Sequence, residues 1–181
     1  MRVIAGDYRG RRLKVPPGVR TRPTADRVRE ALFSILGDVE GLRVADLFAG
    51  SGALGIEALS RRAEHATFVE RDNGAVGILN FNLAAIGIVE GVEVFEWDVP
   101  TWLETVAGNL EFDLVFVDPP YSSAPRLAEP LSKLLPGILS PHATIVTESD
   151  KREPLVLDLP LDDERVYGDT RIAIHRSAGR G

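Results

Sequence analysis

The chain of 181 residues contains no cysteine and only one methionine. Without cysteine it can form neither a disulfide framework nor a thiolate metal site. The three histidines, His65, His142 and His175, are too scattered along the chain to suggest metal-ligand spacing. We therefore expect no bound metal, and a cytoplasmic location is the default expectation.

Long apolar runs are also absent. No stretch approaches the roughly twenty apolar residues that a membrane-spanning helix needs, and residues 1–7 lack the apolar segment of a secretory signal. The 44% of apolar residues are nevertheless enough for one compact core. We expect a compact monomer that does not enter a membrane.

Positive charge is scarce overall but concentrated near the N-terminus. The net charge is −6, whereas residues 1–29 hold nine cations and two anions, a charge of +7 that leaves −13 for the other 152 residues. A basic arm beside an acidic body would suit docking on a phosphate backbone. The alternative is an ordinary solvated basic face.

Apolar periodicity predicts alternating strands and helices. We expect strands near residues 43–48, 65–70, 92–97, 112–117 and 143–147, and helices near residues 53–62, 73–86, 100–107 and 125–135. Such alternation indicates parallel βαβ units with helices on both faces of an α/β sheet. No helix is expected between residues 155–157 and 166–174, which suggest an antiparallel closing hairpin.

The segment before the first strand has its own pattern. Residues 3–5 and 12–15, joined by a turn that contains Gly and Asp, predict a small hairpin. Thr24 can cap a helix that ends at Gly37. Its apolar positions recur at helical spacing: Val28, Ala31, Leu32, Ile35 and Leu36.

An acidic loop, Asp118-Pro119-Pro120-Tyr121, closes the apolar run at residues 112–117. Parallel strands present ligands at their carboxyl ends. The prolines stiffen the loop and remove two N–H donors, so it offers acceptors only: the Asp118 carboxylate and the Pro119 carbonyl. A planar amino group that donates two hydrogen bonds fits this pair, and Tyr121 could lie flat on its ring. The alternative is a strand that merely ends in a proline turn.

A glycine-rich loop lies upstream, between a predicted strand and a predicted helix. Gly50, Gly52 and Gly55 spell G-x-G-x-x-G, and Glu70 follows Gly50 by twenty residues. This is the formal dinucleotide fingerprint, so an NAD-binding domain is one alternative. Asp46 argues against it, because a carboxylate beneath the loop suits an ammonium or sulfonium group better than a pyrophosphate.

Two further features disfavour a dehydrogenase. The predicted strand at residues 92–97 is followed directly by an acid, Asp98, which could accept a hydrogen bond from an adenine amino group. The chain after Glu70 is also too short for a separate substrate domain, and no histidine stands in a setting that suggests hydride chemistry.

These motifs, in this order, resemble those of class I S-adenosylmethionine-dependent methyltransferases: Asp46 to Gly52, Glu70, Asp98 and Asp118 to Tyr121. The Asp-Pro-Pro-Tyr loop is similar to that of enzymes that methylate exocyclic or amide nitrogens. Three other segments resemble the bacterial 16S rRNA guanine-N2 methyltransferase family RsmD: residues 4–13, 22–33 and 167–170. The resemblance covers nearly the whole chain.

The resemblance implies a Rossmann-like class I methyltransferase fold with a mostly parallel sheet and an antiparallel C-terminal strand. It implies methyl transfer from S-adenosylmethionine to the exocyclic N2 amino group of a guanine in 16S rRNA, within a small-subunit ribosomal particle. Adenine N6 or a protein glutamine amide remain alternative acceptors, since each presents a planar NH2 group. A non-catalytic RNA-binding domain is disfavoured because the cofactor-binding motifs and the catalytic motif are both intact.

The resemblance and the charge distribution also assign roles to residues. Cofactor binding is expected of Asp46, Phe48, Gly50, Gly52, Glu70 and Asp98, although Asp98 could instead cap the next helix. Catalysis is expected of Asp118, Pro119 and Tyr121. RNA contacts are expected of Arg9, Arg11, Arg12, Arg20 and Arg22, with residues 1–37 as an RNA-binding extension packed on a methyltransferase domain of residues 38–181.

Overall fold

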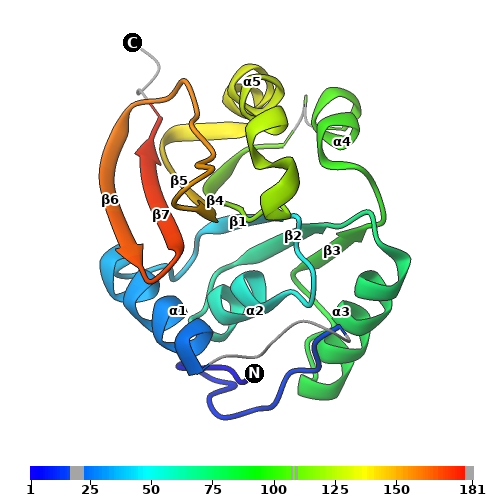
Figure 1. Cartoon of the computed structure of the whole chain (residues 1–181). Coiled ribbons are helices and arrows are strands. Elements are labelled where there is room, and N and C mark those ends of the chain that lie inside the picture. Colours follow the sequence, from blue (N-terminus) through cyan, green and yellow to red (C-terminus); the bar gives the residue numbers. More distant parts are fainter. Residues whose placement is uncertain (17–22, 107, 109, 178–181) are drawn as a thin grey trace.

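A seven-stranded sheet forms the centre of the protein (Figure 1). The computed structural model describes residues 1–16, 23–106, 108 and 110–177, and at residues 23–25 it describes the backbone only. The strands are β1 (Arg43–Leu47), β2 (His65–Val69), β3 (Val92–Phe95), β4 (Phe112–Val117), β5 (Leu139–Asp150), β6 (Leu161–Tyr167) and β7 (Thr170–Arg176). The helices are α1 (Pro23–Leu36), α2 (Ala53–Ser60), α3 (Asn73–Ile86), α4 (Val99–Thr105) and α5 (Ala124–Leu134), with short 3-10 turns at η2 (Tyr121–Ser123) and η3 (Leu135–Ile138).

The strands run in the order β3-β2-β1-β4-β5-β7-β6. The first five pair in parallel, and β7 is antiparallel to both of its neighbours, β5 and β6. From β1 the chain moves outward to β2 and β3, and it then returns to place β4 on the other side of β1. Ligands bind in open α/β sheets at such a reversal, outside the carboxyl ends of the strands. The topology therefore places the expected site between β1 and β4.

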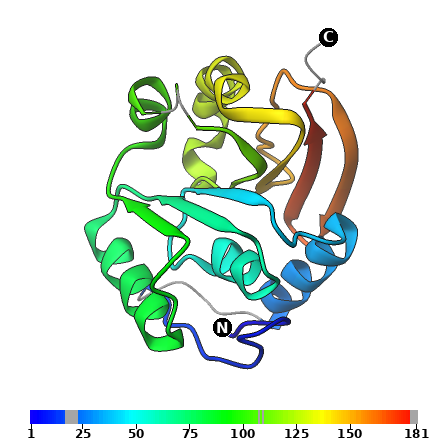
Figure 2. The ribbon, with the colours of Figure 1, turned by 180° about the vertical axis from the view of Figure 1, so that it is seen from behind.

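Helices cover both faces of the sheet (Figures 1 and 2). One apolar cluster joins the sheet to α1, α2 and α3, and a second joins it to α4, α5 and η3. The central strands are apolar on both faces for this reason: Val44, Ala45 and Leu47 of β1 have no exposed surface. The predicted strands and helices of the βαβ region are confirmed, with boundaries that differ by a few residues.

The N-terminal arm, residues 1–16, lies against α2 and α3. Its two halves run antiparallel but share only one bridge, between Arg2 and Arg12, so regular strands do not form. The reason is that part of the arm bonds to side chains instead. Ile4 N and Ala5 N donate to the Glu57 carboxylate of α2 at 2.7 and 3.0 Å.

Glu57 is fully buried and is the charged centre of this contact. It pairs with Arg61 at 2.9 Å and with the buried Arg29 of α1 at 3.8 Å. The Arg29 guanidinium also donates to the carbonyl of Arg2. Arg29, one of the nine cations of residues 1–29, is therefore part of the internal packing and is not available to a phosphate.

The expected N-terminal cap of α1 is wrong. α1 begins at Pro23, so Thr24 lies inside its first turn and is not the N-cap. A proline at the first helical position already has the required φ and has no N–H to satisfy. The C-terminal end of α1 agrees with the prediction, because the helix ends at Leu36 and Gly37 follows it with a φ of 74°.

The closing hairpin is present, but it consists of β6 and β7, and residues 155–157 are not a strand. Leu155 and Leu157 are buried in the cluster on the α5 side, whereas Val156 is 60% exposed. The same alternation of buried and exposed residues is typical of a half-buried strand. It arises instead because an extended connection covers the apolar cluster at the end of the sheet. Among the described residues, no helix is long and apolar enough to cross a membrane.

Candidate active site

A cavity of about 510 Å³ opens at the carboxyl ends of β1, β2, β4 and β5. Its lining combines apolar groups with four carboxylates. It is lined by Phe48, Gly50, Glu70, Arg71, Asp98, Asp118, Pro119, Pro120, Tyr121, Ser123, Leu127 and Glu148.

Acidic residues occupy one face of neighbouring strands at this edge. Phe116 of β4 pairs with Asp46 of β1 and with Val146 of β5. Because side chains alternate along a strand, Asp118 and Glu148, two residues further on, lie on the same face as Asp46. The sheet thus gathers acids that are far apart in sequence.

The glycine loop turns from β1 into α2 through unusual backbone conformations. Phe48 has a φ of 64°, rare for a non-glycine residue, and such strain concentrates at functional sites. Gly52 has a φ of 78°, and a Cβ there would lie 2.2 Å from Leu79 Cδ1. Gly52 therefore permits the close approach of the loop to α3, whereas Phe48 and Gly50 face the cavity.

Glu70 follows β2 and holds the loop in place. Its Oε2 accepts from Gly50 N at 2.9 Å and its Oε1 accepts from Asp72 N at 2.9 Å. Each carboxylate oxygen has a second lone pair, so Glu70 can still accept from ligand hydroxyls. The side chain both shapes the cavity wall and presents acceptors to it.

Asp98 is exposed and also lines the cavity; it follows β3, the strand that pairs with β2. It occupies the N-cap position of α4, but its side chain makes no capping hydrogen bond to the helix backbone. Its Oδ2 accepts from the Thr101 hydroxyl at 3.3 Å. A second acceptor oxygen remains for a ligand.

Asp46 lies beneath the loop and does not line the cavity. It is 2% exposed, and its Oδ2 accepts from Gly55 N, at the start of α2, at 2.8 Å. Burial raises the pKa of Asp46 to about 7, with a smaller contribution from the charge of Glu70, while the bond from Gly55 acts in the opposite direction. A cationic ligand above the loop would favour the ionised carboxylate.

The acidic loop after β4 contributes four consecutive residues, 118–121, to the cavity lining. Burial raises the pKa of Asp118 well above its usual value, and the charges of Glu148 and Asp46 raise it further. Ser123 fixes the following turn, since its N–H and hydroxyl both donate to the Pro120 carbonyl, at 2.9 and 2.8 Å. The Tyr121 hydroxyl lies 3.5 Å from Thr170 Oγ1.

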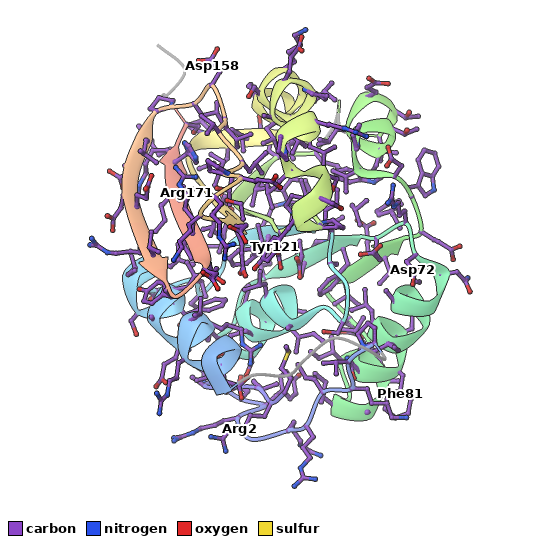
Figure 3. The ribbon with its side chains drawn as sticks, in the orientation of Figure 1. Arg2, Asp72, Phe81, Tyr121, Asp158 and Arg171 are labelled. Carbon is purple, nitrogen blue, oxygen red and sulfur yellow. The ribbon has the colours of Figure 1, made fainter. Side chains whose placement is uncertain are left out.

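Tyr121 is 42% exposed, so its ring is accessible to a ligand. Figure 3 shows it near the middle of the molecule, above α2, whereas Arg2 of the arm lies at the lower end. Arg9, Arg11 and Arg12 are exposed on the arm and do not line the cavity. Arg20 and Arg22 lie outside the described residues.

Seven of the nine residues predicted for cofactor binding and catalysis line this cavity, and the other two, Asp46 and Gly52, support the glycine loop. The prediction missed five lining residues: Arg71, Pro120, Ser123, Leu127 and Glu148. The sequence could have indicated Glu148 as a site residue, because it directly follows a predicted buried strand, as Asp118 and Asp98 do. No group of His, Asp and Glu among the described residues could hold a metal ion.

The fold belongs to a known class. A solved RNA methyltransferase from Salinibacter ruber, in complex with S-adenosyl-L-homocysteine, aligns with a TM-score of 0.65 over 90% of this chain and 96% of that chain, at 20% identity. At that identity the likeness concerns architecture. The protein has the Rossmann-like fold of S-adenosylmethionine-dependent methyltransferases.

A more specific relationship comes from closer relatives. The family model described as conserved hypothetical protein 95 matches residues 1–176. The ribosomal RNA small subunit methyltransferase D of Escherichia coli is 36% identical over 100% of this chain and 92% of its own length. A hypothetical protein from Thermus thermophilus has a solved structure with a TM-score of 0.81 at 33% identity, over 97% of this chain and 98% of that chain. The chain therefore belongs to this family, the RsmD family.

Proposed function

We propose that this protein transfers a methyl group from S-adenosylmethionine to the exocyclic N2 amino group of a guanine in 16S rRNA, within a small-subunit ribosomal particle. The observation that carries the proposal is the Asp118–Pro119 pair at the cavity, which offers two acceptors and no backbone donor at either proline. Such a pair suits an NH2 group. The name of the Escherichia coli relative supports ribosomal RNA as the substrate class.

The cavity fits the cofactor. The backbone at Phe48 and Gly50 would hold its methionine end, and Glu70 would accept from both ribose hydroxyls. Asp98 would accept from the adenine amino group. When bound, S-adenosylmethionine supplies a methyl group already activated by its sulfonium centre.

The chain's own contribution is placement of the acceptor nitrogen. An exocyclic amine is a weak nucleophile because its lone pair is delocalised into the ring. By accepting both N–H bonds, Asp118 and the Pro119 carbonyl would favour the pyramidal, nucleophilic form and stabilise the positive charge that develops on nitrogen. The raised pKa of Asp118 suits it to take up the proton that this nitrogen then loses.

Tyr121 would hold the ring of the base. Its accessible side chain follows the two prolines directly, and a base–aromatic stack contributes roughly 1–3 kcal/mol. A base inside a duplex cannot reach this loop, so the target must be unpaired or flipped out. The cationic arm would meanwhile contact phosphates through Arg9, Arg11 and Arg12, and we propose RNA contacts for Arg20 and Arg22 as well.

Transfer of labelled methyl groups tests the proposal. The protein is incubated with labelled S-adenosylmethionine and, separately, with unmodified small-subunit particles, naked 16S rRNA and a total protein extract, and the labelled RNA is digested to nucleosides. We expect N2-methylguanosine from the particle. Label in N6-methyladenosine or in a protein amide would overturn the guanine assignment. Asp118→Asn is the control for enzyme-dependent label.

A further inference from the structure

Glu148 is a second carboxyl group beside Asp118, and the chemistry proposed above does not use it. It comes from β5, the strand next to β4, and it lines the same cavity as Asp118 and Tyr121. The side chain is only partly exposed. Glu148 therefore lies among the groups that would hold the base, where its carboxylate can contact the base as well.

The register of the sheet makes the two acids neighbours. Val117 of β4 pairs with Thr147 of β5, so Asp118 and Glu148 follow in step on adjacent strands. Adjacent strands lie about 4.8 Å apart, and both side chains point to the same face. Two carboxylate groups are thus presented side by side to whatever enters the cavity.

Among the residues that the structure describes, no cation pairs with Glu148 to compensate for its burial. Burial raises its pKa, and a hydrogen bond from the Tyr121 hydroxyl lowers it by a smaller amount. The negative charges of Glu148 and Asp46 raise the pKa of Asp118, so acids surround this side of the cavity. No Lys or Arg ion pair within the described part of the chain involves Glu148. A poorly compensated acid in a cleft is costly, which points to a role with a ligand.

The edge of guanine offers two kinds of donor in adjacent positions. Its N2 amino group stands beside N1, which carries a hydrogen. In adenine the N6 amino group also stands beside N1, but that nitrogen has a lone pair and accepts. A carboxylate next to the amino-binding pair therefore attracts guanine and repels adenine.

We propose that Glu148 accepts the N1–H of the target guanine while Asp118 and Pro119 hold the neighbouring amino group, so that Glu148 determines selectivity for guanine. The inference rests on the proposed function. Because Asp118 and Glu148 follow paired residues of adjacent strands, one can accept from the amino group while the other accepts from the neighbouring N1–H of the same base. The Tyr121 ring lines the same cavity as Glu148 and would stack on the same base.

The test replaces the target guanine by a base that lacks both the N1–H and the 6-oxo group, so the role of Glu148 is read from the difference in base preference between the wild type and the variant. In the RNA or particle that the protein methylates, the labelled guanine is replaced by 2-aminopurine, which keeps the 2-amino group but has a lone pair at N1. We expect the wild type to prefer guanine strongly. Glu148→Gln should lower kcat/KM for guanine about tenfold or more and change the rate with 2-aminopurine by less than about threefold, so the preference collapses.

Asp150→Asn is the matched control, because Asp150 lies two residues further on the same face of β5, outside the cavity lining. It should retain the wild-type preference, and S-adenosylmethionine affinity should be unchanged in both variants. An equal loss on both bases, or no loss, would overturn the role of Glu148 and leave the proposed function intact. If the wild type instead labels adenine N6 or a protein, the proposed function fails and the N1–H contact fails with it.

Discussion

The side-chain amide of Asn82 in α3 forms a reciprocal pair of hydrogen bonds with the backbone of Lys14 in the arm. It accepts from Lys14 N at 2.8 Å and donates to Lys14 O at 2.9 Å. The same amide donates to the carbonyl of Ser51, in the glycine loop, at 3.0 Å. One buried side chain therefore connects the basic arm to the loop that borders the cavity.

Asn82→Ala should lower the free energy of unfolding by roughly 2–3 kcal/mol, because it leaves several buried backbone groups without a partner. It should also weaken S-adenosylmethionine binding, since the Ser51 carbonyl loses its support. Urea unfolding and calorimetry measure the two effects. Asn80→Ala, at an exposed position of the same helix, is the control and should change neither quantity. Unchanged cofactor affinity in a destabilised Asn82→Ala protein would show that the arm and the loop are not connected through this amide.

Glu70→Ala should weaken S-adenosylmethionine binding by roughly 1–3 kcal/mol, measured by calorimetry without RNA, because it removes the acceptor for the ribose hydroxyls. Glu70→Gln should lie between Ala and the wild type, since one oxygen can still accept from Gly50 N. Exposed Glu90→Ala is the control. Tight NAD binding without S-adenosylmethionine binding would contradict the proposed cofactor.

The raised pKa of Asp46 predicts that the free energy of unfolding depends on pH. Its pKa is about 7 in the folded protein and near 3.8 in the unfolded chain, so the folded state binds the extra proton and stability falls as pH rises between these values. Asp46→Asn removes this loss. The stability of the variant relative to the wild type should rise by about 1.4 kcal/mol per pH unit between roughly pH 4 and 7 and then level off. Urea unfolding at pH 5, 6, 7 and 8 measures the slope; a difference that does not change with pH would mean that Asp46 is ionised throughout.

Asp118→Ala should reduce the single-turnover rate of methyl transfer by more than about tenfold, or 1.4 kcal/mol, with little change in cofactor affinity. The contact it removes forms with the target amino group and strengthens toward the transition state. Because burial and neighbouring acids raise the pKa of Asp118, the wild-type rate should fall as pH drops through that raised value. A smaller effect on the rate would mean that Asp118 only shapes the turn after β4 and does not contribute to methyl transfer.

Replacement of Arg9, Arg11 and Arg12 together by Gln should weaken RNA binding and flatten its salt dependence. Each lost phosphate contact should lower the slope of log Kd against log salt by roughly 0.7–0.9. Cofactor affinity should stay the same, because all three side chains are exposed outside the cavity. Binding to one RNA or particle across a salt series gives the slope. An unchanged slope would identify these residues as a solvated basic face.

The parallel core was predictable because its signals are local. Buried strands such as residues 112–117 are continuous apolar runs, and Asp118 directly follows one of them. Acids at strand ends reach the ligand-binding edge wherever the strands are parallel. The strand predicted at residues 155–157 was wrong because a local signal has this limit. Alternating apolar and polar residues indicate a half-covered extended segment, but they do not show whether a neighbouring strand pairs with it.

The sequence alone determined the strands, the glycine loop and the acids at strand ends, because each depends on neighbouring residues and on backbone geometry. Only the tertiary structure decided which of those residues share a surface. It placed Glu148 beside Asp118 through the register of β4 and β5, and it enclosed Arg29 and Glu57 within the packing of the arm. Register and packing between distant segments depend on contacts across the whole fold, so the charge of a residue in the sequence does not reveal whether it will face solvent, a ligand or another charge.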